Sequence, residues 1–79
     1  MDVTITIWLD QNVKKIHVTA ENNPSIELTM YSVSGEKVLR KQLSGSGELS
    51  VHSLPSGMYI VQLLMKDYPQ IMNYKIVIP

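Results

Sequence analysis

The sequence contains no cysteine and no phenylalanine, and its 79 residues include one tryptophan and one alanine, Ala20. Without cysteine there can be no disulfide framework, no CxxC redox pair and no Cys-ligated zinc site. Seven Lys and Arg side chains balance seven Asp and Glu, so the formal net charge is zero. This balance lacks the basic excess that binding to a phosphate backbone needs, and nucleic acid is therefore not expected as a partner.

Long apolar runs are also lacking. No run approaches the roughly 20 residues that a membrane-spanning helix needs, so no membrane span is expected. The first four residues, Met-Asp-Val-Thr, show neither the basic start nor the apolar stretch of a secretory signal. The length predicts one domain over residues 1–79. Because so small a domain buries only about 60% of its unfolded surface, its core must come from many short packed strands or from contact with a neighbour.

What the chain does contain is β-branched residues, with eight Val, eight Ile and four Thr. These residues favour pleated strands, and the near absence of alanine disfavours helices. Apolar and polar residues alternate with a period of two through most of the sequence. We expect strands at 3–9, 15–20, 26–31, 37–43, 49–51, 58–65 and 71–78. Their spacing predicts an all-β fold, a small seven-stranded antiparallel β-sandwich with an immunoglobulin-like Greek key.

Three of these strands have a distinct character. Residues 58–65 are apolar except for Gln62, which is typical of a central strand covered on both faces. Residues 71–78 place Met72, Tyr74, Ile76 and Ile78 on one face. The strand at 37–43 carries Lys37, Arg40 and Lys41, which favours a solvated edge strand over a binding patch. The first and last strands are apolar and extended, so an edge-strand homodimer is a further expectation.

Few residues point to chemistry. Neither histidine, His17 or His52, has a second metal-ligand residue nearby, and both read as polar positions facing solvent. The segment Ser-Val-His-Ser at 50–53 holds a nucleophile type and a base type, but such proximity is expected by chance in a chain with eight serines. The Gly-Ser-Gly at 45–47 is too short for a phosphate-binding loop. We therefore expect no metal and no cofactor, and an enzyme is the least favoured class.

Two aromatic residues have more specific interpretations. Trp8 falls on the threonine-bearing side of the first strand, where it either packs over the edge of the sandwich or contacts a sugar or a partner protein. Tyr59 follows Gly57 at the start of a central strand. Sandwich folds often place a tyrosine there, with its hydroxyl bonded to an upstream loop in a tyrosine corner. Gly35, in the tight connection at 34–36, is placed to take a positive φ.

Two stretches together carry a family resemblance. Residues 26–38 read I-x-L-x-M-Y-S-V-S-G-E-K-V, and residues 54–61 read L-P-S-G-M-Y-I-V. They resemble the C-terminal sorting domain of the type IX (Por) secretion system, type A. That family shows an alternating apolar strand, Tyr-Asp-x-x-Gly-x-x-Val, Leu-x-x-Gly-x-Tyr-x-Val and a closing strand opened by Lys, here at 74–78. This chain has Ser32 in place of the acidic residue, lacks the family's Pro-Asn-Pro near 9–12, and has Pro79 where the family commonly ends in a basic residue.

The resemblance implies a non-catalytic domain at the C-terminus of a larger protein, secreted or placed on the cell surface by way of the periplasm. Its implied partners are an outer-membrane protein of the secretion machinery and a sortase-like protease that removes the domain afterwards. The motif positions carried over are Gly35 and Gly57 as turns, Tyr59 as the corner and Lys75 in the terminal strand. The alternative is an immunoglobulin-like accessory or adhesive module of a secreted or surface protein, which binds glycan or protein through Trp8 or an edge strand.

Overall fold

The computed structural model describes residues 4–22, 24–66 and 70–79, and every regular element in these ranges is a β-strand. Val3 and most of the segment 66–69 lie outside the described residues. The strands are β1 (Ile5–Asp10), β2 (Lys15–Ala20), β3 (Ser25–Ser32), β4 (Lys37–Ser44), β5 (Gly47–Ser50), β6 (Gly57–Met65) and β7 (Gln70–Ile78). The prediction of seven strands is confirmed.

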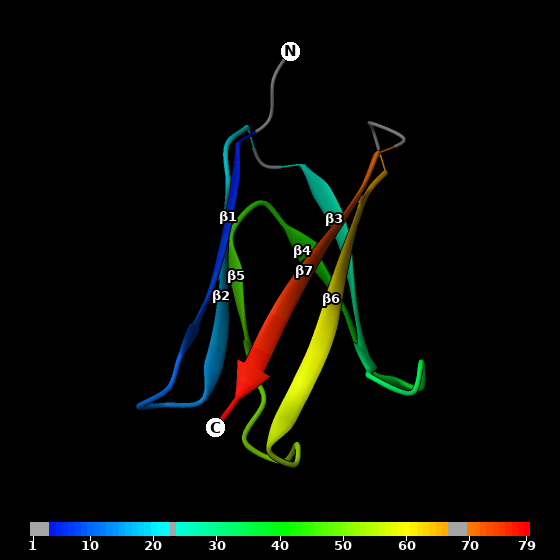
Figure 1. Cartoon of the computed structure of the whole chain (residues 1–79). Coiled ribbons are helices and arrows are strands. Elements are labelled where there is room, and N and C mark those ends of the chain that lie inside the picture. Colours follow the sequence, from blue (N-terminus) through cyan, green and yellow to red (C-terminus); the bar gives the residue numbers. More distant parts are fainter. Residues whose placement is uncertain (1–3, 23, 67–69) are drawn as a thin grey trace.

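The strands form two antiparallel sheets that lie as two layers (Figure 1). One sheet has three strands in the order β1-β2-β5, and the other has four in the order β4-β3-β6-β7. The chain changes sheet between β2 and β3, between β4 and β5, and between β5 and β6. The predicted all-β architecture is confirmed. Nothing in the strand order conflicts with an immunoglobulin-like Greek key, and that finer detail stays a prediction.

The core fills the space between the inner faces of the two sheets. Its members alternate along each strand with less buried positions, as the period of two in a strand requires. The buried apolar side chains are Ile16, Val18, Leu49 and Val51 on one side and Ile26, Leu28, Met30, Leu43, Tyr59, Val61, Leu63, Met65, Ile76 and Ile78 on the other. Full burial of one such aliphatic side chain stabilises the fold by about 1.5–3 kcal/mol relative to exposure.

The fifth strand begins earlier than the sequence predicts. The predicted range is 49–51, whereas β5 begins at Gly47 and ends at Ser50. A Cβ at position 47 would lie 2.6 Å from Cδ2 of the buried Leu43. Gly47, which reads as a loop residue in the sequence, thus allows the start of β5 to approach this core side chain. Val51 follows the strand and is fully buried.

The prediction that residues 58–65 are covered on both faces is wrong. β6 is central, since it pairs with β3 and with β7, and its inner-facing side chains are buried. On its outer face, however, Met58 is 40% exposed, and Ile60 and Leu64 are only half-buried. A sandwich has two layers, and among the described residues no third layer covers this face. The outer side chains of β6 are shielded only by their neighbours within the sheet.

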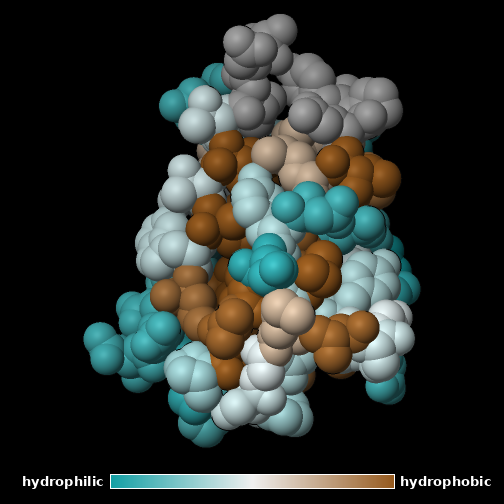
Figure 2. Space-filling model, viewed as in Figure 1, coloured by the Kyte–Doolittle hydropathy of each residue, from teal (hydrophilic) through white to brown (hydrophobic). Residues whose placement is uncertain are grey.

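One side of the sandwich is open. Within the described part of the chain, β1 pairs only with β2, and β7 pairs only with β6. These two edge strands lie on the same side, whereas β4 and β5 contact each other on the opposite side. The core-facing side chains of the open side remain half-buried, namely Ile5, Ile7, Leu9, Met72 and Tyr74. Figure 2, in the view of Figure 1, shows apolar surface along this side.

Candidate functional site

The turn between β3 and β4 carries the first motif glycine. Gly35 has a φ of +88°, the positive value that the sequence predicted. Its N–H donates to the Ser32 carbonyl oxygen at 2.9 Å, and the Ser32 N–H donates to the Glu36 carbonyl oxygen at 2.9 Å. The Ser32 hydroxyl oxygen accepts a hydrogen bond from the Glu36 N–H at 3.3 Å. Ser32, at the position of the acidic residue in the family motif, therefore supplies a side-chain acceptor for this turn.

The second motif surrounds the start of β6. Gly57 has a φ of +149°, in the range that favours glycine. Tyr59 is buried, and its hydroxyl donates a 2.7 Å hydrogen bond to the Pro55 carbonyl oxygen. This is the tyrosine-corner bond that the sequence predicted, and it ties the loop before β6 to the core. The Ser56 hydroxyl donates to the Pro79 carbonyl oxygen at 2.9 Å, so the segment after β7 lies beside the same loop.

Two motif residues from opposite parts of the chain share one row on the outer face of the four-stranded sheet. Ile60 of β6 pairs with Tyr31 of β3 on one side and with Lys75 of β7 on the other. Because neighbouring strands lie about 4.8 Å apart, the backbones of Tyr31 and Lys75 are separated by about 10 Å. The sequence identifies Lys75 as a motif position. It does not show that Lys75 shares a row with Ile60 and Tyr31, because that row depends on the register of three strands.

We call the outer surface of β6 and β7 the β6–β7 face. Two apolar pairs lie toward its ends, Met58 with Val77 and Leu64 with Ile71. Val77 is 60% exposed and Ile71 is 57% exposed. The charged residue of this face is Lys75, and no ion pair to its ammonium group occurs among the described residues. Large contiguous patches of exposed apolar side chains are typical of protein contact sites.

A second row lies on the outer face of the three-stranded sheet. Trp8 of β1 pairs with His17 of β2, which in turn pairs with Glu48 of β5. The rings of Trp8 and His17 are stacked, with centroids 4.9 Å apart and planes inclined by 17°. Trp8 is 45% exposed, and it lies on the threonine-bearing side, as predicted. The sequence predicts that His17 faces solvent freely. In the structure Trp8 packs on its ring, and His17 is therefore half-buried.

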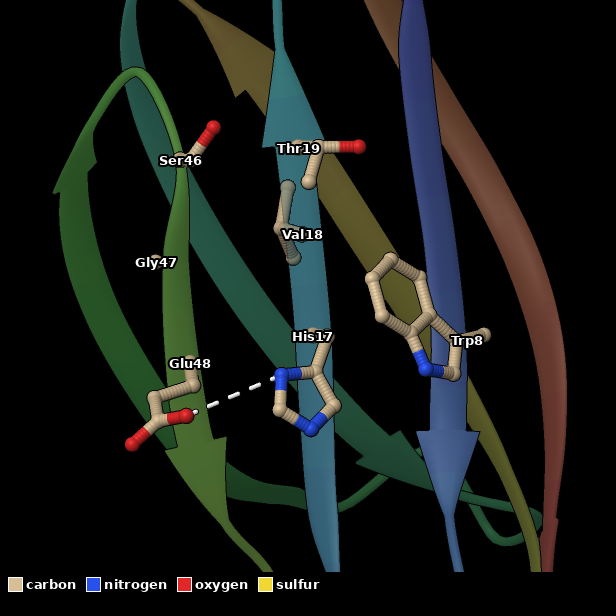
Figure 3. A pocket seen from close by; sticks show the side chains of 7 residues that line it. All are labelled: Trp8, His17, Val18, Thr19, Ser46, Gly47 and Glu48. Atoms are coloured by element: carbon tan, nitrogen blue, oxygen red, sulfur yellow. Dashed lines mark ion pairs between the residues drawn. The ribbon is translucent and has the colours of Figure 1, made fainter.

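A shallow hollow of about 290 Å³ lies beside this row (Figure 3). Trp8 bounds it on the β1 side, and Ser46 and Glu48 bound it on the β5 side. The full lining comprises Trp8, His17, Val18, Thr19, Ser46, Gly47 and Glu48. Val18 and Gly47 form a cross-strand pair, and the Val18 side chain is buried in the core, so this pair contributes backbone to the floor.

Glu48 is the electrostatic centre of the hollow. Lys15 Nζ donates to Glu48 Oε1 at 3.0 Å, and His17 Nδ1 lies 3.6 Å from Oε2. The hydrogen bond from Lys15 and its positive charge lower the pKa of the Glu48 carboxyl, with smaller contributions from His17 and Lys41. The carboxylate thus stays ionised to a lower pH than an isolated glutamate. Such exposed pairs add little stability, but they hold the carboxylate in one orientation.

The remaining candidates stay isolated. His52 and Ser50 are exposed, and the described residues contain no group of side chains that could hold a metal ion. Lys37, Arg40 and Lys41 lie exposed on β4, the edge strand of its sheet, as predicted. Arg40 Nε pairs with Glu27 Oε1 at 3.0 Å. Lys41 Nζ donates to the Glu48 carbonyl oxygen at 2.8 Å.

Fold and surface together define the class of this chain as a small two-layer β module with an exposed apolar strand pair at one edge. The model of one protein family, described as secretion system C-terminal sorting domain, matches residues 4–79. The chain belongs to this family, as the sequence motifs indicate. The domain is a C-terminal sorting signal of the type IX secretion system, and it marks proteins for export to the cell surface or the medium.

No curated protein matches the chain significantly. Among the described residues, no helix is long and apolar enough to cross a membrane.

Proposed function

We propose that the chain is the C-terminal domain of a larger exported protein and that an outer-membrane protein of the type IX machinery recognises it through the β6–β7 face. The observation that carries this proposal is the exposure of Ile71 and Val77 on β7, on either side of Lys75. Protein interfaces combine apolar contact residues with polar and charged neighbours. The β6–β7 face has this composition, with Lys75 as its charged group.

The motif residues divide into two roles in this proposal. Gly35, Gly57 and Tyr59 shape the turns and the corner that hold the strands in register. Lys75 stands on the recognised face itself. Recognition by shape and charge requires no reaction, and we assign no catalytic step to the chain. A sortase-like protease then removes the domain after export.

A reporter fusion tests the recognised face. Residues 1–79 are fused to the end of a periplasm-directed reporter in a host that carries a type IX system. We expect the native fusion to reach the cell surface or the medium with the domain removed. We expect Ile71→Asp together with Val77→Asp to lower export about tenfold or more, because two charges would have to be desolvated at the contact. Quantitative immunoblots of periplasm, surface and medium give the measurement.

The matched control is Thr6→Asp together with Ser50→Asp, on the outer face of the three-stranded sheet. All four positions are exposed, so each substitution changes the free energy of unfolding by about 0.5 kcal/mol or less. The control pair is expected to leave export at the native level. Equal export of both double variants, with equal melting temperatures, would place recognition elsewhere on the domain.

The second candidate function is an accessory or adhesive module that binds glycan or protein. The stacked but exposed Trp8 on the opposite sheet favours it.

A further inference from the structure

We propose that the hollow beside Trp8 binds one pyranose ring of a glycan, with Trp8 as the stacking surface. This inference rests on the second candidate function and is independent of the sorting role. It concerns the outer face of the three-stranded sheet, whereas the proposed contact with the machinery lies on the other sheet.

The first argument is the place of an aromatic ring on a polar surface. Outward positions of β1, β2 and β5 other than Trp8 carry polar side chains, namely Thr6, Asp10, Lys15, His17, Thr19, Glu48 and Ser50. Core packing does not account for Trp8, which points away from the core and is 45% exposed. A pyranose has an apolar C–H face and a rim of hydroxyl groups. An indole surrounded by polar side chains complements both parts of that ring.

The second argument is which hydrogen-bonding groups the hollow offers. β2 lies between β1 and β5, so its backbone groups are engaged in the two ladders. Over β2, a ligand must therefore bond to side chains. Thr19 and Ser46 supply hydroxyls, His17 an imidazole and Glu48 a carboxylate held ionised by Lys15. The Ser46 oxygen accepts a 3.3 Å hydrogen bond from the Ala20 N–H, which orients the hydroxyl at the rim.

The third argument is size and charge. A volume of about 290 Å³ lies at the lower limit for pockets that hold small molecules, so one ring fits better than a longer ligand. The charges of Lys15 and Glu48 are paired, so the hollow offers no concentrated charge of one sign. An extended peptide would gain its main-chain hydrogen bonds from a free strand edge. The hollow lies over the outer face of β2 and β5; β2 has no free edge, and the free edge of β5 lies on the side of the sandwich where β5 contacts β4. These features favour a neutral, hydroxyl-rich ligand over a peptide or a polyanion.

The single tryptophan gives a direct measurement. Because Trp8 is the one tryptophan of the 79 residues, selectively excited tryptophan fluorescence reports on this site alone. The probes are methyl β-D-glucopyranoside, methyl β-D-galactopyranoside, methyl α-D-mannopyranoside and N-acetyl-D-glucosamine. We expect at least one of them to give a saturable fluorescence change with a Kd of about 1–10 mM, as suits a shallow site that contacts one ring. Amide signals of His17 and Thr19 in NMR spectra should shift with the same Kd.

Variants separate binding from folding. Trp8→Ala should weaken binding about tenfold or more by the NMR measurement, and its export in the reporter fusion should match that of the native chain. Should Trp8→Ala fail to fold, Glu48→Gln provides the test, since Glu48 is exposed and its substitution should weaken binding about fivefold. Ser50→Ala, on the same face but outside the lining, is the matched control and should keep the native Kd.

Three results would overturn the proposal. One is the absence of a saturable change with any of the four sugars up to about 100 mM, well above the Kd that one stacked ring should give. Another is native sugar affinity in Trp8→Ala or, if that variant does not fold, in Glu48→Gln. The third is a response of the same signals to an Ala-Lys-Ala peptide at lower concentration than to any sugar, which would assign the hollow to a protein ligand.

Discussion

At the residue scale, the Tyr59 hydroxyl connects the buried start of β6 to the loop that precedes it. The ring is 5% exposed, and the oxygen donates to the Pro55 carbonyl at 2.7 Å. The ring and the hydroxyl of Tyr59 therefore stabilise the fold in two different ways. The ring fills the core, and the hydroxyl fixes the loop that leads into Gly57.

Tyr59→Phe removes the hydroxyl and keeps the ring. We expect the free energy of unfolding to fall by about 0.5–1.5 kcal/mol, the net contribution of one hydrogen bond. For a domain of this size, each 1 kcal/mol lowers Tm by about 4–8 °C. Thermal unfolding followed by circular dichroism measures the change. Tyr31→Phe is the matched control, because its half-buried ring lies on the outer face, and its Tm should stay close to native. Identical Tm values for both variants would show that the corner bond contributes nothing.

The residue scale is also where sequence reasoning succeeds and fails most clearly. The corner bond of Tyr59 and the positive φ of Gly35 follow from local motifs, and both are confirmed. The row of Trp8, His17 and Glu48 could not be foreseen, because it depends on where β5 begins and on its register against β2. The only sequence signal was the tryptophan on a threonine-bearing strand. Local patterns encode turns and faces, whereas cross-strand neighbours come from tertiary register.

At the element scale, β6 shows that an apolar run identifies a central strand without showing what covers it. Both faces of the strand are apolar in sequence, but only one contacts the core. The other contributes Met58, Ile60 and Leu64 to the β6–β7 face. In a domain with a third layer these residues would be buried. In this two-layer sandwich they instead form the surface that we propose the secretion machinery recognises.

The turn of the β3–β4 hairpin depends on the positive φ of Gly35. A Cβ at this position would meet no atom within 4 Å. A side chain here would therefore destabilise the fold only through the strained backbone conformation and not through a steric clash. We expect Gly35→Ala to lower the free energy of unfolding by about 1–2 kcal/mol, because an L residue is disfavoured at this φ. Gly35→Asn should cost clearly less, since asparagine tolerates the left-handed region better. Urea unfolding of the two variants measures both values, and equal losses would contradict a backbone origin.

At the scale of the whole molecule, the sandwich is closed where β4 meets β5 and open where β1 and β7 lie. Each of these edge strands has one backbone edge without a partner among the described residues, beside half-buried core side chains. The sequence indicates both edges, because its first and last strands are apolar and extended. Free edges of this kind are templates for pairing with another strand. The open side therefore offers the chain a way to associate with a second copy.

The edge-strand homodimer stays a prediction, and β7 is the edge on which we expect it. β7 has nine residues and β1 has six, so pairing of two β7 strands forms the longer ladder. Gel filtration at about 10 μM and about 1 mM should show a dimer that grows with concentration. Asn73→Lys places a charge on the exposed side of β7 and should weaken the dimer about tenfold, because lysine on an edge opposes strand pairing. Thr6→Lys makes the matched change on β1 and should leave the β7 dimer nearly unchanged. A chain that remains monomeric at both concentrations would refute the prediction, and a dimer weakened only by Thr6→Lys would move the contact to β1.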